Sequence, residues 1–319
     1  MPANQAKALA FKCAHPPWLV NRWIAAYGIE VARKICEYDQ KIPTTTVRLR
    51  EPGARTQLAE EGVRLEPGLL LSTACQVEGG NITNTRAFRE GSVAIQDEAS
   101  QLVAFLLGTV GNSGKNNATG RARILDCCAA PGGKTSILAE RNPEAQIFAI
   151  DLHPRRASLT RRLVRNQNVG VVAADVNKLP FASEFERILV DAPCSGTGTL
   201  ARNPEIKWRL DAADIFDLQG RQKFILQSAL RYLAPGGRLL YSTCSLEKEE
   251  NADVIDSVLA ESKSFRLLDC KAELQALQQK GELTWKDLDS LLQGSYLRTL
   301  QGVHPGDGFF AALIERVSD

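Results

Sequence analysis

Two cysteines of this sequence stand at positions where α/β proteins usually do chemistry. Cys194 follows the apolar run from Ile188 to Val190, and Cys244 follows the run from Leu239 to Tyr241. Each run predicts a buried strand, and ligands of open α/β sheets bind at the carboxyl ends of the strands. Small polar residues flank both cysteines, and such surroundings can stabilise the thiolate that acts as a nucleophile. The pair therefore predicts covalent chemistry beside a bound ligand.

Asp191 stands three positions before Cys194, where its carboxyl group can exchange a proton with a substrate ring. The alternative for any cysteine is that of a small buried side chain without a chemical role. We expect that alternative for the four cysteines that lie outside such polar segments, Cys13, Cys36, Cys75 and Cys270.

A glycine-containing loop follows a third apolar run, at residues 123–125, and leads into a predicted helix at residues 135–141. Glycines let a backbone approach a ligand closely, and the N–H groups at a helix start favour polar or negative groups. The spacing matches neither the phosphate-binding Walker loop nor the dinucleotide fingerprint. Alone, the loop is equally consistent with an ordinary turn. The residues that it offers to a cofactor are Cys128, Ala129, Ala130, Pro131, Gly132, Gly133 and Lys134.

Acidic residues at the next two strand ends strengthen the case for a cofactor. Asp151 ends a strand predicted at residues 146–150, and Asp175 follows one predicted at residues 169–173. An acid at the second strand end accepts hydrogen bonds from ribose hydroxyls in this architecture, and an acid at the third can meet an adenine amino group. Either acid alone can equally be a solvated loop residue. Three consecutive strand ends, with Asp126 and Cys128 at the first, predict a nucleoside-shaped cleft.

The composition is that of an ordinary globular protein and restricts its partners. The 319 residues are 44% hydrophobic with a formal net charge of +2, so nucleic-acid binding would depend on local basic faces. No apolar stretch approaches the ~20 residues of a membrane span, and residues 1–11 lack the apolar core of a secretory signal. The eight cysteines show no zinc-ligand spacing and are expected to be free thiols. We predict a cytoplasmic protein without a metal or a membrane partner.

The elements that position these residues change character along the chain. From residue 123 onward strands and helices alternate, which implies a parallel sheet covered on both faces. We predict a smaller α+β region at residues 1–91 and the α/β catalytic domain at residues 92–319. The other predicted segments are a loose tail at 1–12, a helix pair at 17–37 broken near Gly28, a strand at 45–49, a helix at 96–108, a linker at 111–120 and a late strand at 309–314.

Taken together, the motifs resemble those of the RNA 5-methylcytosine methyltransferases. The matching segments are LDCCAAPGGKT at 125–135, Asp151, DAPCSGTG at 191–198, RNPEIKW at 202–208, YSTCSLEKEEN at 241–251 and HPGDGFF at 304–310. The resemblance runs from about residue 16 to the carboxyl terminus, and its two-cysteine signature is highly specific. It implies a Rossmann-like methyltransferase domain with a doubly wound, mostly parallel sheet of seven strands, preceded by an RNA-binding α+β region.

The resemblance also implies the role of each residue. Cys244 adds to carbon 6 of cytosine, which makes carbon 5 enamine-like and divides one hard step into easier ones. Cys194 assists release of the covalent intermediate, and Asp191 holds the N3/N4 edge of the ring beside the cofactor. The implied methyl donor is S-adenosylmethionine, with the 128–134 loop along its methionine and ribose side, Asp151 at the ribose and Asp175 at the adenine.

The implied partner is RNA, either 16S ribosomal RNA or a small-subunit assembly intermediate, bound by a monomer. A base must leave its stack to reach two cysteines in a pocket, so a looped or unfolded RNA is expected. We expect phosphate contacts from Arg202 and Lys207 and a packing role for Trp208. A basic run of Arg155, Arg156, Arg161, Arg162 and Arg165 forms either an RNA-facing surface or a solvated helix face.

Two alternatives stay open at this point. The motifs report chemistry rather than target, so transfer RNA can replace ribosomal RNA as the substrate. The chain can also be a non-catalytic ribosome-assembly factor, although such a binder needs no thiolate, and both cysteines and Asp191 are present. The bacterial 16S enzymes carry an additional amino-terminal helical RNA-binding domain, and this sequence begins near the point where that domain would end. We therefore expect a short form or a fragment.

Overall fold

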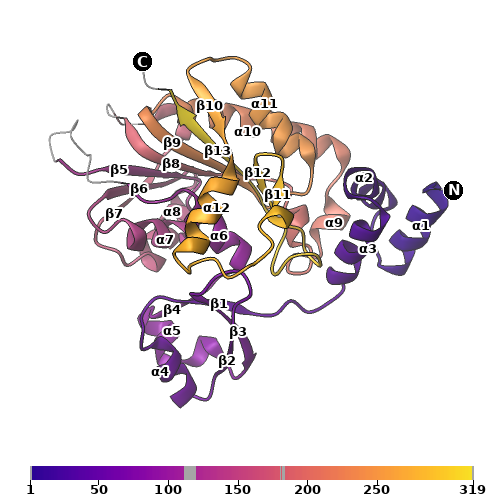
Figure 1. Ribbon diagram of the computed structural model, residues 1–319, viewed down its shortest axis with the longest axis horizontal. Coiled ribbons are helices and arrows are strands. Elements are labelled where there is room, and N and C mark those ends of the chain that lie inside the picture. Colours follow the sequence, from indigo (N-terminus) through magenta and orange to yellow (C-terminus); the bar gives the residue numbers. More distant parts are fainter. Residues whose placement is uncertain (1, 111–119, 180, 182–183, 318–319) are drawn as a thin grey trace.

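The computed structural model describes residues 2–110, 120–179, 181 and 184–317. The predicted linker lies outside the described residues, except for Gly120. The described part of the chain forms a large sheet covered by helices, a smaller sheet below it and a set of amino-terminal helices at one side (Figure 1).

The large sheet contains nine strands in the order β11-β12-β13-β9-β8-β5-β6-β7, with β10 paired to β13. Strands β9, β8, β5, β6 and β7 are neighbours in this order and run parallel to one another. Strands β10 to β13 are joined by antiparallel pairs. The prediction of seven strands was too low, because the carboxyl-terminal segment adds short antiparallel strands that carry no alternation with helices. The strands are β5 Arg123–Cys127, β6 Gln146–Asp151, β7 Val169–Ala173, β8 Phe185–Asp191, β9 Leu233–Thr243, β10 Phe265–Leu268, β11 Leu292–Gln293, β12 Tyr296–Arg298 and β13 Phe310–Arg316.

The strand order reverses between β5 and β8, and this reversal determines where a ligand can bind. From β5 the chain moves outward through β6 to β7, then returns to place β8 and β9 on the other side of β5. A crevice opens at the carboxyl ends of the strands where the order reverses in this way. Asp191 at the end of β8 therefore faces the same edge as the loop that follows β5.

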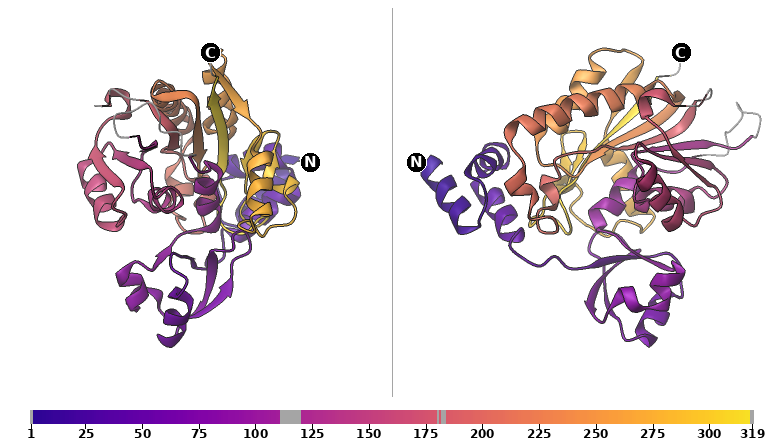
Figure 2. Two further views of the ribbon diagram at one scale, coloured as in Figure 1. Left: turned by 60° about the vertical axis from the view of Figure 1, so that its left-hand side comes forward. Right: turned by 180° about the vertical axis from the view of Figure 1, so that it is seen from behind.

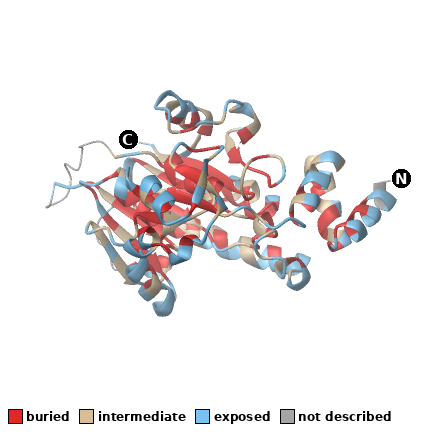
Figure 3. Ribbon diagram, turned by 90° about the horizontal axis from the view of Figure 1, so that it is seen from below, coloured by how far each residue is buried: buried red, intermediate tan, exposed pale blue. Residues whose placement is uncertain are grey.

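Helices cover both faces of this sheet because successive strand residues point to opposite sides. Ile124 of β5 enters the core formed with α6 (Glu98–Leu106), α7 (Gly133–Arg141) and α12 (Cys270–Gln279). Its neighbour Leu125 enters the core formed with α10 (Ala212–Leu230) and α11 (Ala252–Leu259). Figure 3 shows the buried strands between the more exposed helices. The sheet is thus rigidly held, as its catalytic edge requires.

The amino-terminal residues form helices rather than a loose tail. Helices α1 (Pro2–Lys12), α2 (Pro17–Tyr27) and α3 (Ile29–Tyr38) pack together, with the break at Gly28 where it was predicted. The prediction for residues 1–12 was wrong because α1 buries Ala6, Leu9 and Ala10 against the other two helices. The same core contains Leu200, Leu246 and Leu300 of the catalytic domain.

The residues between these helices and the catalytic domain form a second, separate unit. Its four-stranded sheet has the order β2-β3-β1-β4 and its own core around Val47, Leu58 and Cys75. Residues 1–91 therefore do not form one region: the helices pack on the catalytic domain, and β4 extends the small sheet to Ile95 (Figure 2). The elements are β1 Thr46–Leu49, α4 Ala54–Glu60, β2 Arg64–Pro67, β3 Ala74–Gly79, α5 Arg86–Glu90 and β4 Val93–Ile95.

Within the described residues, no helix combines the length and the apolar character needed to cross a bilayer.

Candidate active site

The two cysteines of the strand ends meet at the carboxyl edge of the sheet. Strands β8 and β9 are adjacent and parallel, with Asp191 in register with Ser242, so the segments that follow them emerge side by side. The Sγ atoms of Cys194 and Cys244 lie 3.4 Å apart, and both residues are half-buried. By contrast, Cys13, Cys36, Cys75 and Cys270 are buried, as expected for structural cysteines.

A cavity of about 690 Å³ opens beside the two sulfurs. A volume of this size suits a ligand of cofactor size. Of the predicted site residues, those that line it are Cys128, Ala130, Asp151, Asp175, Asp191, Cys194 and Cys244. Ala129, Pro131, Gly132, Gly133 and Lys134 do not belong to its lining. The cavity therefore joins the strand ends of β5, β6 and β8 to both cysteines, although only part of the glycine loop reaches it.

Lys134 points toward the cysteines. Its Nζ atom lies 2.8 Å from Oδ2 of Asp191, and Ser242 donates a hydrogen bond of 2.8 Å to Oδ1 of the same carboxylate. Burial acts to lower the pKa of Lys134, but the Asp191 carboxylate outweighs burial and raises that pKa. The result is an ammonium–carboxylate pair held at the end of β8, which the sequence pattern did not indicate.

The surroundings of Cys194 disfavour loss of its proton. The hydrogen bond to Cys244, together with burial, raises the pKa of the Cys194 thiol well above its ordinary value. The two sulfurs lie within hydrogen-bond distance of each other, and either thiol can be the donor.

One buried carboxylate links the two cysteine segments. Glu250 is 0% exposed, and its Oε1 accepts hydrogen bonds from the backbone N–H of Ser195 at 2.8 Å and from Nε2 of Gln222 at 2.9 Å. Its Oε2 accepts from the hydroxyls of Ser195 and Ser245. Because Ser195 follows Cys194 and Ser245 follows Cys244, Glu250 holds both sulfur-bearing loops in place. In the sequence it stands in the run EKEEN, which resembles a solvated surface segment.

The loop after β5 has a backbone that only some residues can adopt. Cys128 has φ of 61°, and Gly132 has φ of 107° at the start of α7. Thr135 donates a hydrogen bond of 2.6 Å to Oδ2 of Asp126 and so fixes the helix start to the strand. Burial raises the pKa of Asp126 to about 7, so this carboxyl group is partly protonated near neutral pH. The hydrogen bond between Thr135 and Asp126 thus fixes both ends of the loop, at α7 and at β5.

Replacing Gly132 with alanine is expected to lower the free energy of unfolding by about 1–3 kcal/mol. The left-handed backbone is strained for any other residue, and a Cβ atom there would overlap the side chain of Val164. Urea unfolding measures the change. The matched control is Gly220→Ala within α10, where a Cβ meets nothing within 4 Å and should stabilise the helix by about 0.5–1 kcal/mol. Equal stability of the two variants would contradict this account of the loop.

Two acidic side chains stand at the remaining strand ends of the cavity. Asp151 accepts a hydrogen bond of 3.0 Å from the N–H of His153 and lies 3.4 Å from Nε of Arg156. Asp175 accepts from the N–H of Asn177 at 2.9 Å. Carboxylate oxygens suit a ribose diol and an adenine amino group, and apolar side chains suit the faces of a purine. The apolar lining residues are Ile150, Leu152, Val176, Phe224 and Ile225.

Most of the basic residues expected at RNA have partners inside the protein. Lys207 is buried, and Trp208 is 63% exposed, so the expected phosphate contact and the expected packing role were both wrong. Four of the others contact neighbouring elements, and all five arginines of the basic run are exposed, so either interpretation of that run stays open. Their partners are Asp151 for Arg156, the carbonyl of Val171 for Arg161, the carbonyls of Arg89 and Glu90 for Arg165, and the carboxylates of Asp97 and Asp307 for Arg202.

Among the described residues, no cluster of histidine, cysteine and acidic side chains could hold a metal ion.

Comparisons with known proteins identify relatives of this chain. A family model described as 16S rRNA methyltransferase RsmB/F matches residues 115–315. The probable ribosomal RNA small subunit methyltransferase B of Bacillus subtilis is 35% identical over 274 residues, which are 82% of this chain and 59% of the relative. The ribosomal RNA small subunit methyltransferase B of Pasteurella multocida is 34% identical over 318 residues, with 95% and 65% covered. The chain thus spans less than two thirds of the length of either relative.

A solved structure shows the fold over nearly the whole chain. A methyltransferase homologue from Pyrococcus horikoshii superposes with a TM-score of 0.75 at 26% identity, covering 97% of this chain and 98% of that one. This confirms the predicted Rossmann-like methyltransferase fold, and the family match confirms the predicted resemblance. On these grounds, the chain belongs to the RsmB/F family of 16S rRNA methyltransferases.

Proposed function

We propose that this protein transfers the methyl group of S-adenosylmethionine to carbon 5 of cytosine in RNA, with 16S ribosomal RNA as its substrate. The observation that carries the proposal is the 3.4 Å separation of the Cys194 and Cys244 sulfurs beside a cavity that also contains Asp191. A protein that only binds RNA and cofactor has no need of two converging sulfurs. Family membership supports the RNA substrate and the methyl donor.

The charged pair at the end of β8 matches one edge of cytosine. N3 of the ring is a hydrogen-bond acceptor and the 4-amino group is a donor. The Asp191 carboxylate lines the cavity and can accept from the amino group, while the Lys134 ammonium lies outside the lining, 2.8 Å from that carboxylate, and holds it in place. The pair therefore recognises the amino edge of cytosine.

Cys244 is the nucleophile in this proposal. Its thiolate forms a bond to carbon 6, and the electron pair moves to carbon 5, which becomes nucleophilic. When bound, S-adenosylmethionine supplies the electrophilic methyl group that carbon 5 takes up. The sulfur of Cys244 is then a neutral thioether.

Cys194 assists the release of the methylated RNA from Cys244. Once Cys244 is a thioether, its negative charge no longer raises the pKa of Cys194, which can then act as a base. The Cys194 thiol first loses its own proton to solvent, and the resulting thiolate takes the proton from carbon 5. The electron pair of that C–H bond reforms the 5,6 double bond, and the bond between carbon 6 and Cys244 breaks to return the Cys244 thiolate. All atoms balance, and the transferred methyl group replaces that proton.

Methylation mapping tests the reaction and its target together. The purified protein is incubated with isotope-labelled S-adenosylmethionine and either transcribed 16S ribosomal RNA or bulk transfer RNA. Bisulfite sequencing and mass spectrometry of nucleosides then locate the label. Labelled 5-methylcytosine in the 16S transcript is the expected result. Label only in transfer RNA would replace the target, and label on the amino group or on no RNA would refute the chemistry.

Asp151→Ala is expected to weaken binding of S-adenosylmethionine roughly 10- to 100-fold, because charge-assisted hydrogen bonds to the ribose are lost. Asp151 is 4% exposed and lines the cavity. Titration calorimetry measures the affinity without any RNA present. The control is Glu66→Ala, which removes one exposed carboxylate from β2 in the small sheet. An unchanged affinity in the Asp151 variant would place the ribose elsewhere.

A further inference from the structure

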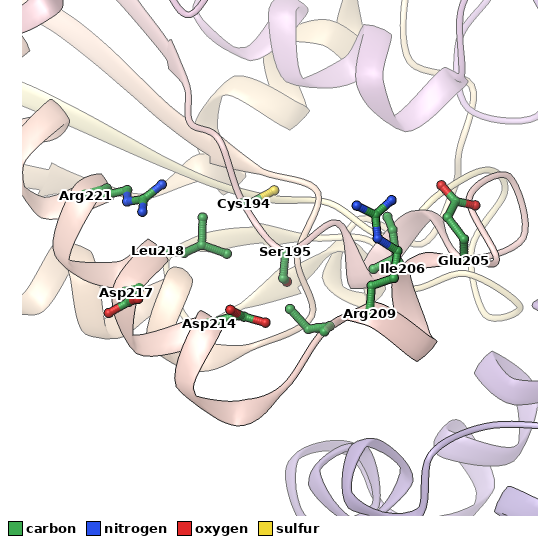
Figure 4. Close-up of a pocket in the computed structure, with 10 residues that line it drawn as sticks. Cys194, Ser195, Glu205, Ile206, Arg209, Asp214, Asp217, Leu218 and Arg221 are labelled. Atoms are coloured by element: carbon green, nitrogen blue, oxygen red, sulfur yellow. The ribbon is translucent and has the colours of Figure 1, made fainter.

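A second cavity adjoins the first on the far side of Cys194. Its volume is about 300 Å³, and it shares Cys194 and Arg221 with the larger cavity. Helix α9 (Ile206–Arg209) and the first half of α10 form its walls. Figure 4 shows Arg209 and Arg221 on opposite sides of Cys194, with Ile206 beside Arg209. Cys244 lines the larger cavity but not this one.

The two arginines of this cavity are not used to hold the fold. Both are exposed, and among the described residues neither guanidinium has a hydrogen-bond or ion-pair partner. Arg156, which lines only the larger cavity, is instead paired with Asp151. Free guanidinium groups beside a catalytic sulfur are available to a ligand, and their planar fork suits the edge of a nucleobase.

Exposed aromatic side chains lie on the two helices that contribute to this cavity. Trp208 is 63% exposed, Phe224 is 62% exposed and Phe216 is 60% exposed. Trp208 precedes Arg209 on α9, Phe216 and Phe224 lie two turns apart on α10, and Phe224 lines the larger cavity. Aromatic rings presented to solvent beside cationic groups are the usual platform for single-stranded nucleic acid, because every base can stack on them.

We propose that the second cavity holds the nucleobase next to the target cytosine in the RNA chain, and so makes methylation depend on that neighbour. The inference rests on the proposed function. The target itself must reach Cys244, so the adjoining cavity, which touches Cys194 alone, receives the next residue of the strand. Apolar walls from Ile206, Leu210 and Leu218 suit the faces of a base.

The charges around the cavity favour a base over a phosphate. Glu205, Asp214 and Asp217 also line it, and three carboxylates beside two guanidinium groups would repel a phosphate. Asp214 is already engaged, since it accepts from the N–H of Asp211 at the start of α10. The remaining donors and acceptors match the mixed edge of a nucleobase, which presents both kinds of group.

A cycle that combines protein and RNA changes tests this assignment. Short RNAs that contain the cytosine identified by the 16S mapping are prepared in three forms. One is intact, one lacks the base immediately 5′ of the cytosine, and one lacks the base immediately 3′ of it. Wild-type protein should methylate one of the two abasic RNAs about tenfold less efficiently, as kcat/KM, than the intact RNA. In Arg209→Ala the same abasic change should cost little more, because the partner of that base is already gone.

Further variants separate a base contact from a charge effect. Arg209→Lys keeps the charge but loses the fork, so it should behave like Arg209→Ala in base dependence. The control Lys263→Ala removes a charge from the turn before β10, at the opposite edge of the sheet, and should retain the wild-type dependence. The proposal would be overturned if the losses in kcat/KM from Arg209→Ala and from base removal were additive at both abasic positions. It would also be overturned if the sole effect of Arg209→Ala were a weaker salt dependence. Either result would indicate a phosphate contact instead. A wild type that methylates intact 16S RNA but ignores both neighbours refutes only this inference, whereas absence of all methylation refutes the proposed function itself.

Discussion

Cys244→Ala is expected to abolish methyl transfer, whereas Cys194→Ala is expected to leave the protein covalently attached to RNA. The first variant lacks the sulfur that adds to carbon 6, and the remaining sulfur of the cavity, Cys194, lies 3.4 Å from the position that it leaves. A loss of about 10³-fold or more is expected for a missing nucleophile. The second variant can form the adduct but lacks the base that releases it.

Two measurements distinguish these outcomes. Transfer of labelled methyl groups to RNA gives the rate, and denaturing gel electrophoresis shows protein that migrates with RNA. Wild-type protein should show little attached RNA, Cys194→Ala much, and the double variant Cys194→Ala/Cys244→Ala none. Cys270→Ala is the control, because Cys270 is buried at the start of α12 and lines neither of the two cavities. Full activity in Cys244→Ala, or adducts that persist in the double variant, would rule out the assigned roles.

Glu250→Ala is expected to lower both stability and turnover by a large amount. The change removes the acceptor for the N–H of Ser195, for Gln222 and for two serine hydroxyls, all of them buried. Each buried donor left without a partner costs about 1–3 kcal/mol, so a total loss of at least about 3 kcal/mol is expected. The two cysteine segments also lose their common anchor, so kcat should fall by more than the loss of folded protein explains.

Urea unfolding and methyl-transfer kinetics measure the two effects on the same samples. Glu250→Gln keeps one carbonyl oxygen for Ser195 and Gln222, and the serine hydroxyls can rotate to accept from its amide group. It should therefore lie between wild type and alanine in both measurements. Glu261→Ala removes an exposed carboxylate that contacts Gln227 and serves as the control. If Glu250→Ala were as stable and active as this control, the link between the two cysteine segments would contribute to neither stability nor activity.

The sequence pattern could predict the position of Cys244 at a strand end, but it could not predict the buried position of Glu250. The strand-end positions of Cys194, Cys244 and Asp151 could be predicted, because an apolar run followed by a polar residue marks the end of a buried strand. Parallel strands then bring those ends to one edge. The motifs also indicated the family, which the matched residues 115–315 confirm.

Other features followed from no local pattern. Lys134 stands in the glycine loop but pairs with Asp191, which is 57 positions away in the chain. Arg202 and Lys207 looked available to RNA, yet one is paired with acids of other elements and the other is buried. Trp208 and Arg209, which follow directly, are exposed instead, and Arg209 lines the second cavity.

The physical reason lies in what each level of structure can encode. Periodicity and strand ends are set by neighbours in the chain, since they reflect which residues can be buried together within one element. The partner of a charged side chain is set by whichever element packs against it, and the strength of that pairing depends on burial that no short segment contains. The amino acid order alone therefore determined the strand edge at which the candidate site residues lie. Only the packing of α9, α10 and the β9 segment decided which charges serve the fold and which remain available to a ligand.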